Sequence, residues 1–287
     1  MSENKQRAEA GVLYVVATPI GNLRDITLRA LDILESADIL ACEDTRTALK
    51  LLNRFGIRGP KLVAYHEHNE NERAPQLIAA LKQGQSVALI SEAGTPGISD
   101  PGARLVALAH EEGVPVRPVP GPSALAAALS VSGFDLRRGF LYLGFPPAKR
   151  GERRKYLSEV AHERRPLVLF ESPHRLAETL EDLYEILGER RVFLAREMTK
   201  RHEEYTLSEL SALKERFAGE EARGEVTLVI EGAAKSREEP EGVEVEEELS
   251  RLLDEGVPLK EASRLLAQRT GLSAKEIYRL GLKLKKS

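Results

Sequence analysis

Short apolar runs alternate with amphipathic segments along the first half of this chain, and this alternation constrains the fold more than any other feature. Each apolar run is short enough for a buried strand, and each amphipathic segment repeats its apolar residues at helical spacing. This order predicts an α/β domain with a largely parallel sheet. The predicted strands are Val12–Ala17, Ile39–Ala41, Lys61–Ala64, Ser86–Ser91 and Val116–Val119. The predicted helices are one capped by Asp25, then Arg46–Arg54, Arg73–Gln83, Gly102–Glu112 and Ser123–Val131.

A second α/β unit is predicted after a hinge at Ser132-Gly133-Phe134. Its strands are Phe140–Leu143, Leu167–Phe170, Val192–Ala195, Glu203–Leu207 and Val226–Ile230, and its helices are Glu152–His162, Leu176–Leu187 and Glu209–Phe217. We therefore expect a disordered N-terminus over residues 1–11, an N-terminal α/β domain over 12–132 and a C-terminal α/β domain over 133–235.

The last part of the chain, residues 236–287, combines an acidic stretch with a basic one. Glu238–Glu248 is interpreted as a linker or an exposed helix start. Helices are predicted over Leu259–Gln268 and Ser273–Lys283, with a capping-box spacing between Ser273 and Glu276. The outline is that of a helix-turn-helix, although a helical hairpin docked on the core fits the pattern equally well.

Charge and cysteine content narrow the function classes. The 287 residues carry a formal net charge of −3 and one cysteine, Cys42, which excludes an internal disulfide and favours a reducing cytoplasm. The polar N-terminus has no signal-peptide core, and no apolar run approaches a membrane span. Residues 259–287 hold eight bases and two acids, and 149–155 is also basic. Either run alone is typical of a solvated surface, but together they favour a polyanionic partner.

Five loops rich in glycine, proline or charge follow predicted strands, where α/β sheets bind ligands. The most functional of them is Ser91–Gly102, which holds three glycines, two prolines and the acids Glu92 and Asp100. Taken alone, Thr18–Leu23 is better explained as an ordinary turn, and Val119–Ala124 is almost as well explained by core packing. The other four are Thr18–Leu23, Val119–Ala124, Phe170–Arg175 and Ala195–Lys200.

Several common site types are absent or disfavoured. His66 and His68 with nearby acids suggest a metal site, but alternate residues of an extended segment point to opposite sides, so polar substrate contacts are preferred. No Gly-x-Gly, Gly-x-Ser-x-Gly or His-Glu-x-x-His pattern occurs. Dehydrogenase and hydrolase interpretations are therefore weak, and no metal is expected.

Six segments occur in an order that is typical of one protein family. They are VATPIGNLRDIT, CEDTR, SEAGTPGISDPG, PGPSA, ESPHR and AREMTK, running from Val16 to Lys200, and GEVTLVIEG at 224–232 extends the match. On these residues the chain resembles the RsmI family of methyltransferases within the tetrapyrrole methylase superfamily. The C-terminal helical segment is similar to the helix-turn-helix appendage of that family.

The resemblance implies a fold, a cofactor and a substrate. It implies two α/β domains with S-adenosyl-L-methionine in the cleft between them, in a homodimer. It also implies methylation of the ribose 2′-oxygen of a decoding-centre cytidine of 16S rRNA in the small ribosomal subunit, cytidine 1402 in the conventional count.

Motif positions imply the contacts of the cofactor. These would be Pro19, Ile20, Gly94, Thr95, Ile98, Ser99, Ser123, Ala124, Phe170, Glu171, Ala195, Arg196 and Thr227. In the wider superfamily the long loop usually has Gly-Asp-Pro where this chain has Gly94-Thr95-Pro96, so a hydroxyl replaces the carboxylate. Asp44, Arg46 and His66 would face the substrate, and so would Asp100.

The chemistry of methyl transfer suggests which residues to test. A 2′-hydroxyl is a poor nucleophile until its proton leaves, so Asp100, Glu171, His174 and a Lys200 of lowered pKa are candidates for a general base. Lys149, Arg150 and Arg153 are candidates for contacts with rRNA phosphates. Two alternatives remain at this point: a tetrapyrrole C-methyltransferase that acts on a precorrin or uroporphyrinogen, and a non-enzymatic RNA-binding protein.

Overall fold

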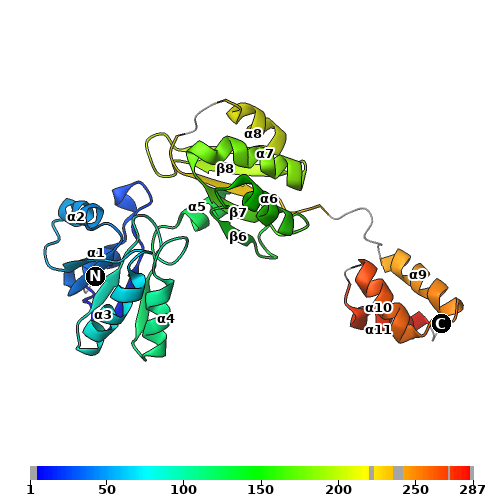
Figure 1. Cartoon of the computed structure of the whole chain (residues 1–287), viewed down its shortest axis with the longest axis horizontal. Coiled ribbons are helices and arrows are strands. Elements are labelled where there is room, and N and C mark those ends of the chain that lie inside the picture. Colours follow the sequence, from blue (N-terminus) through cyan, green and yellow to red (C-terminus); the bar gives the residue numbers. More distant parts are fainter. Residues whose placement is uncertain (1–4, 220–222, 235–241, 271, 285–287) are drawn as a thin grey trace. The chain divides into compact units, whose positions relative to one another are not determined.

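The computed structural model describes residues 5–219, 223–234, 242–270 and 272–284. The chain divides into two compact units, Met1–Gly232 and Ala233–Ser287, and the first of them contains two sheets (Figure 1). The predicted α/β class is confirmed for the first unit, and the predicted helical C-terminal segment is confirmed for the second.

The first sheet is parallel throughout and has the strand order β3-β2-β4-β1-β5. Its strands are β1 (Leu13–Val16), β2 (Ile39–Cys42), β3 (Lys61–Ala64), β4 (Val87–Leu89) and β5 (Val116–Val119). All five therefore end at one edge of the sheet, and the loops that follow them gather there. This arrangement explains why the polar loops in the first half of the sequence come together.

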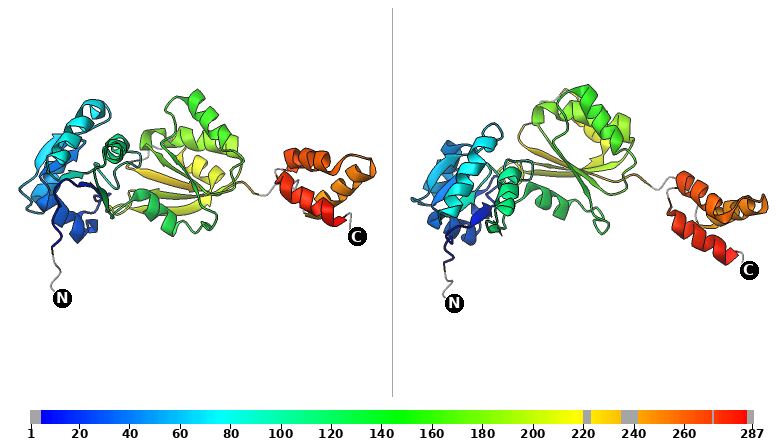
Figure 2. Two further views of the ribbon diagram at one scale, coloured as in Figure 1. Left: turned by 90° about the horizontal axis from the view of Figure 1, so that it is seen from below. Right: turned by 60° about the horizontal axis from the view of Figure 1, so that its bottom comes forward.

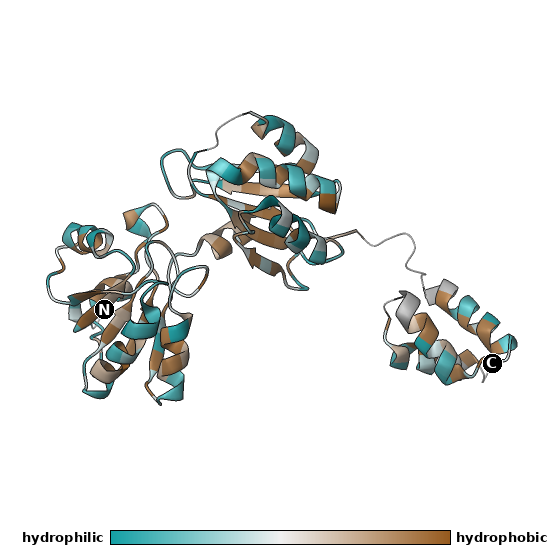
Figure 3. Cartoon of the chain, viewed as in Figure 1, coloured by the Kyte–Doolittle hydropathy of each residue, from teal (hydrophilic) through white to brown (hydrophobic). Residues whose placement is uncertain are grey.

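Helices cover both faces of the first sheet because successive strand residues point to opposite sides. Tyr14 packs with α1 (Leu28–Ser36) and α2 (Thr45–Arg54). Leu13 packs with α3 (Glu70–Lys82) and α4 (Ala103–Glu111). Strands buried on both faces are apolar throughout, as the brown sheet colours in Figure 3 show.

Helix caps differ in one place from the sequence-based expectation. Asp25 was expected to cap α1, but it closes a short 3-10 turn, η1 (Leu23–Asp25), and Thr27 is the cap, with its Oγ1 accepting from the Ala30 N–H at 3.1 Å. A threonine and an aspartate two residues apart offer the same capping chemistry, so the sequence alone does not decide between them.

The second sheet is mixed and has the strand order β6-β7-β10-β8-β9. Its strands are β6 (Leu141–Gly144), β7 (Leu167–Glu171), β8 (Arg191–Arg196), β9 (Glu204–Glu209) and β10 (Val226–Ile230). Only β6 and β7 pair in parallel. One face packs on α6 (Arg150–Glu159), α7 (Leu176–Leu187) and α8 (Leu210–Phe217), which Figure 2 shows beside the sheet. A second short 3-10 turn, η2 (Pro173–Arg175), precedes α7.

The other face of the second sheet packs on α5 (Ala124–Val131). This helix was expected to complete the first domain, but Ala128 and Leu129 are buried against Val168, Phe193 and Val229 of the second sheet. The helix therefore joins the two sheets into one body, while the domain boundary near residue 132 stays a prediction.

The N-terminal segment has defined contacts over residues 5–11, and residues 5–8 lie against α1. The Ala8 N–H donates to Ser36 Oγ at 2.8 Å, and Lys5 Nζ pairs with Glu35 Oε2 at 2.6 Å. The disorder expected for residues 1–11 is therefore wrong for 5–11, and residues 1–4 lie outside the described part of the chain.

The second unit contains three helices among its described residues: α9 (Gly242–Asp254), α10 (Leu259–Thr270) and α11 (Ala274–Leu284). Their core contains Val245, Leu249, Leu259, Ala262, Leu266 and Ile277. The acidic stretch is thus part of a packed helix from Gly242 onward rather than a linker, and residues 238–241 lie outside the described part. Across both units, none of the described helices combines the length and apolarity that a membrane crossing requires.

Candidate active site

The first unit contains a hollow of about 480 Å³ at the loops that follow the strands; we call it the loop hollow. Residues of the loops that follow the first sheet and residues of the second sheet line it. They are Ile20, Glu92, Ala93, Gly94, Thr95, Ile98, Ser99, Asp100, Ser123, Ala124, Phe145, Phe170, Glu171, Ser172, Pro173, Met198, Gly224, Glu225, Val226 and Thr227. A cavity of this size with mostly apolar walls and a few polar groups is typical of a small-molecule site.

The long loop Ser91–Gly102 forms one wall of the loop hollow. A two-way backbone pairing holds its start, with the Thr18 N–H donating to Gly94 O at 2.8 Å and the Gly94 N–H donating to Thr18 O at 3.0 Å. Gly94 has a φ of +80°, which favours glycine, and Ser99 has a φ of +61°, which is uncommon for a residue with a side chain. Such backbone conformations are frequent at functional sites.

A hydrogen bond joins this loop to the second sheet. Ser99 Oγ lies 2.6 Å from the Tyr142 hydroxyl on β6. Gly144 lies beside it, and a Cβ on that glycine would be 3.3 Å from Ser99 Oγ. The strained loop is thus held against β6 at the rim of the loop hollow.

Asp100 is the ionisable group of this wall that is best suited to accept a proton. Burial raises the pKa of the Asp100 carboxyl to about 6, and the charges of Glu43 and Glu92 add to the increase, while a Ser91 hydrogen bond opposes it. A base with a pKa near the working pH combines a sizeable deprotonated fraction with useful basicity.

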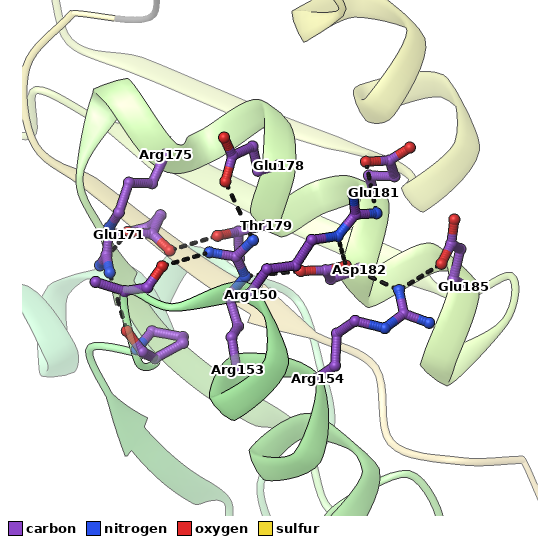
Figure 4. Close-up of polar contacts among 12 residues, drawn as sticks. Arg150, Arg153, Arg154, Glu171, Arg175, Glu178, Thr179, Glu181, Asp182 and Glu185 are labelled. Atoms are coloured by element: carbon purple, nitrogen blue, oxygen red, sulfur yellow. Dashed lines mark hydrogen bonds and ion pairs between the residues drawn. The ribbon is translucent and has the colours of Figure 1, made fainter.

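Glu171 also lines the loop hollow, but its carboxylate already has three partners, of which Figure 4 shows Thr179 and Arg175. Oε1 accepts from the Ser172 N–H at 2.6 Å and pairs with Arg175 Nη2 at 2.5 Å, and Oε2 accepts from Thr179 Oγ1 at 2.6 Å. Arg175 in turn donates to Pro146 O at 3.1 Å. Glu171 therefore fixes the loop after β7, and this geometry does not favour it as a general base.

Lys200 does not have the lowered pKa that a general base would need. Burial lowers it, but the ion pair with Glu197 at 2.8 Å and the one with Glu225 at 3.4 Å outweigh burial, so the pKa of Lys200 is raised. The expectation for this residue is wrong because two carboxylates lie beside it. His174 belongs to η2 and does not line the loop hollow.

Most residues implied as cofactor contacts meet at the loop hollow, but three do not. Pro19 lines a neighbouring hollow, Ala195 is buried in the apolar cluster around α5, and Arg196 pairs with Glu204 at 2.6 Å. The ten that line the loop hollow are Ile20, Gly94, Thr95, Ile98, Ser99, Ser123, Ala124, Phe170, Glu171 and Thr227.

Several lining residues escaped the sequence analysis. Phe145 lies outside the five loops singled out from the sequence, and Met198 lies within one of them but was not implied as a contact. Gly224 and Glu225 precede β10, and GEVTLVIEG was the only available signal for them. Phe145 packs edge-to-face on Phe170, with the ring centroids 5.5 Å apart.

A smaller hollow of about 200 Å³, which we call the flanking hollow, adjoins the loop hollow at Glu92. It lies at the ends of β1, β2 and β4. Its lining residues are Thr18, Pro19, Leu23, Cys42, Glu43, Asp44, Thr47, Ala48, Lys50, Leu51, Ile90, Ser91 and Glu92.

Among the residues implied to face the substrate, Asp44 lines the flanking hollow and Asp100 lines the loop hollow. The Asp44 carboxylate caps α2 and binds Arg46, whose side chain is 87% exposed. His66 lines neither hollow and lies against Asn69, with Nε2 and Nδ2 3.1 Å apart. The three implied residues Asp44, Arg46 and His66 therefore do not form one cluster of free polar groups.

The arginines of the basic stretch at 149–155 are bound by the acids of α7 (Figure 4). Arg153 is fully buried and donates to Asp182 Oδ2 at 2.8 Å. Arg150 pairs with Asp182 and Glu181 but remains half-exposed, and Lys149 is 82% exposed. The interpretation of Arg153 as a phosphate contact is therefore wrong, because its charge is neutralised inside the fold.

Among the residues that the structure describes, no group of three or more His, Cys, Asp or Glu side chains is arranged to hold a metal ion.

Comparisons with known proteins agree with this arrangement. Residues 12–214 match the family model of the tetrapyrrole (corrin/porphyrin) methylases, and residues 239–285 match that of the RsmI C-terminal HTH domain. The chain is 44% identical to ribosomal RNA small subunit methyltransferase I of Synechocystis sp., over 96% of this chain and 98% of that protein. It is 48% identical to the protein of the same name from Mesorhizobium japonicum, over 95% and 92%.

Solved structures share the fold at lower identity. The methyltransferase CobJ superposes with a TM-score of 0.59 at 21% identity, over 79% of this chain and 97% of that one. A uroporphyrin-III C-methyl transferase from Thermus thermophilus, complexed with S-adenyl homocysteine, superposes with a TM-score of 0.53 at 21% identity, over 77% and 96%.

Proposed function

The chain belongs to the tetrapyrrole methylase family, and from this premise we propose that it is an S-adenosyl-L-methionine-dependent rRNA methyltransferase. We further propose that its target is the ribose 2′-oxygen of a decoding-centre cytidine in the small-subunit rRNA. The observation that carries the proposal is the loop hollow, which brings ten of the thirteen implied cofactor contacts and Asp100 to one place.

The residues of the loop hollow fit S-adenosyl-L-methionine. Ile20, Ile98, Phe170 and Val226 offer apolar walls for an adenine ring, while Thr95, Ser123 and Thr227 offer hydroxyls to polar groups. When bound, the sulfonium supplies an electrophilic methyl group. Methyl transfer from a sulfonium does not require a metal ion, so the side chains around the loop hollow need not include metal ligands.

Asp100 would supply the proton acceptor. Its carboxylate, with a pKa of about 6, is mostly ionised near neutral pH and lines the same wall as the strained Ser99. Rigid placement of the acceptor hydroxyl beside such a base lowers the barrier by orientation as well as by proton transfer. The hydrogen bond between Ser99 and Tyr142 keeps this wall in place.

An rRNA substrate is favoured over a tetrapyrrole because of the full-length relatives. Both proteins compared above at 44–48% identity are named for small-subunit rRNA, whereas the uroporphyrin enzyme shares the fold alone at 21% identity. To test this, small ribosomal subunits that lack the modification are incubated with isotope-labelled cofactor, and the rRNA is analysed by mass spectrometry. A labelled 2′-O-methylcytidine is expected, while label on an added uroporphyrinogen instead would support the alternative.

The second unit is proposed to contribute rRNA affinity. Lys260, Arg264, Lys275 and Arg279 are exposed on its helices α10 and α11, and it has an apolar core of its own. Deleting residues 233–287 is expected to weaken binding to small subunits and to reduce its salt dependence, because phosphate contacts release counterions. Filter binding at two salt concentrations measures this, and calorimetry should show unchanged cofactor affinity. Unchanged subunit affinity would contradict the proposed role.

We also propose that the protein forms a homodimer. Tyr205 and Leu207 of the edge strand β9 are 46% and 53% exposed, and apolar side chains on a sheet edge are typical of surfaces that pair. Light scattering should give about twice the 31.7 kDa mass of one chain, and substitution of both residues by Lys should give the monomer mass.

A further inference from the structure

The flanking hollow adjoins the loop hollow in a way that suits the base of an acceptor nucleotide. The two hollows share Glu92, and the charges of Glu43 and Glu92 lie near enough to Asp100 to affect it. In a nucleotide, the base is attached to the carbon next to the one that carries the 2′-hydroxyl. A ribose whose 2′-hydroxyl reaches Asp100 therefore has its base close to the flanking hollow.

The size and walls of the flanking hollow suit one flat ring. Its volume of about 200 Å³ lies below the roughly 300–1,000 Å³ of pockets for drug-sized ligands. Pro19, Leu23, Leu51 and Ile90 give it apolar walls. When a base leaves its stack in the RNA, contacts with these apolar walls can replace its contacts with the neighbouring bases.

The polar groups of the flanking hollow are unusual for a protein that acts on RNA, because Glu43 and Glu92 both face it. Neither carboxylate has a hydrogen bond or ion pair with another of the described residues, in contrast to Asp44, which is bound by Arg46. Burial raises the pKa of Glu43 and the charge of Glu92 raises it further, which together outweigh the opposing effect of His66. Two carboxyl groups are therefore available to a ligand that donates hydrogen bonds.

We propose that the flanking hollow binds the base of the acceptor nucleotide and that Glu43 and Glu92 select cytosine by accepting hydrogen bonds from its exocyclic amino group. This rests on the proposed function. Carboxylates accept from the N4 amino group of cytosine, whereas uracil presents a carbonyl oxygen at the same position. That oxygen would leave the partly buried Glu43 carboxylate without a donor, which is costly, while the exposed Glu92 would lose a partner to water. Lys50, on the same wall, is placed to meet an oxygen of the base or a phosphate.

The experiment measures methylation rates on small subunits whose target position is cytidine, uridine or a cytidine analogue that lacks the amino group. The enzymes are the full-length wild type, Glu43→Gln, Glu92→Gln and the control Glu111→Gln, an exposed carboxylate on α4 that lines neither hollow. For the wild type, the cytidine rate should exceed both others by roughly tenfold or more, the size of a good base contact. Glu111→Gln should keep that ratio.

In Glu43→Gln or Glu92→Gln the ratio should fall toward one, and removal of the amino group should then cost little further. Calorimetry of cofactor binding establishes that each variant is folded, and the wild-type rate on the amino-free analogue gives the same information without any substitution. Equal wild-type rates on cytidine and the analogue, or unchanged ratios in both variants, would overturn the inference and leave the proposed function standing. If the wild type transferred no methyl group to rRNA, the proposed function itself would fail.

Discussion

Asp100→Asn is expected to lower the turnover number by about 10²- to 10⁴-fold, the usual contribution of a positioned base. The substitution preserves size and removes the only group of the loop hollow whose pKa is raised to about 6. Calorimetry should show cofactor affinity unchanged within a few-fold, because an amide occupies the same space. Asp135→Asn, which alters an exposed carboxylate outside both hollows, serves as the control and should leave turnover unchanged.

The pH dependence of kcat/KM tests the role of Asp100 independently. A base acts only when it is deprotonated, so kcat/KM of the wild type should fall about tenfold per pH unit below about pH 6, where Asp100 becomes protonated. The residual activity of Asp100→Asn should lack this acidic limb. An acidic limb that persists in the variant would assign it to another group.

Asp182→Ala is expected to produce the largest loss of stability, about 3–5 kcal/mol of unfolding free energy, because it removes the buried carboxylate that pairs with Arg153 and leaves this buried arginine with the largely exposed Glu178 as its acidic partner. Asp182 and Arg153 are both fully buried, and Asp182 also accepts from Arg154 at 2.9 Å and from Arg150 at 3.2 Å. Denaturant unfolding measures the change. Glu185→Ala, which removes an exposed partner of Arg154, should change stability little.

A double substitution shows whether the stability lost in Asp182→Ala comes from an unpaired buried charge or from lost packing. Asp182→Leu combined with Arg153→Met removes both charges at similar volume, and most of the lost stability should return. Burial raises the pKa of Asp182, but the arginines outweigh it and hold the pKa below its usual range. The stabilisation is thus present above the unfolded pKa and is lost as pH falls through the folded pKa. A double variant as unstable as Asp182→Ala would show that the charges are not the cause.

The sequence predicts the first sheet well because its signals are local. The inner strands β1, β2 and β4 are short apolar runs, the edge strands β3 and β5 also contain polar residues, and the loop motifs follow strands that end at one edge. The capping-box spacing at Ser273 likewise places the start of α11 within one residue. Such features depend on residues a few positions apart, so they are visible without a structure.

Other features depend on partners far apart in the chain and were not predictable. Arg153 looks like a surface cation until Asp182, 29 positions later, is found beside it. Lys200 acquires its raised pKa in part from Glu225 on the segment before β10. The small residues of α5 show no preferred face, so nothing local indicates that this helix covers the second sheet.

The position of α5 also limits how the first unit can be divided. A fragment that stops at residue 132 would keep this helix and lose the strands that bury Leu129. The apolar face of α5 would then be exposed to water, which favours aggregation. A fragment that starts at residue 133 would expose Val168 and Phe193 in turn. We therefore expect the two sheets to fold together. The loop hollow, which residues from both sides line, would then form only when both parts are present.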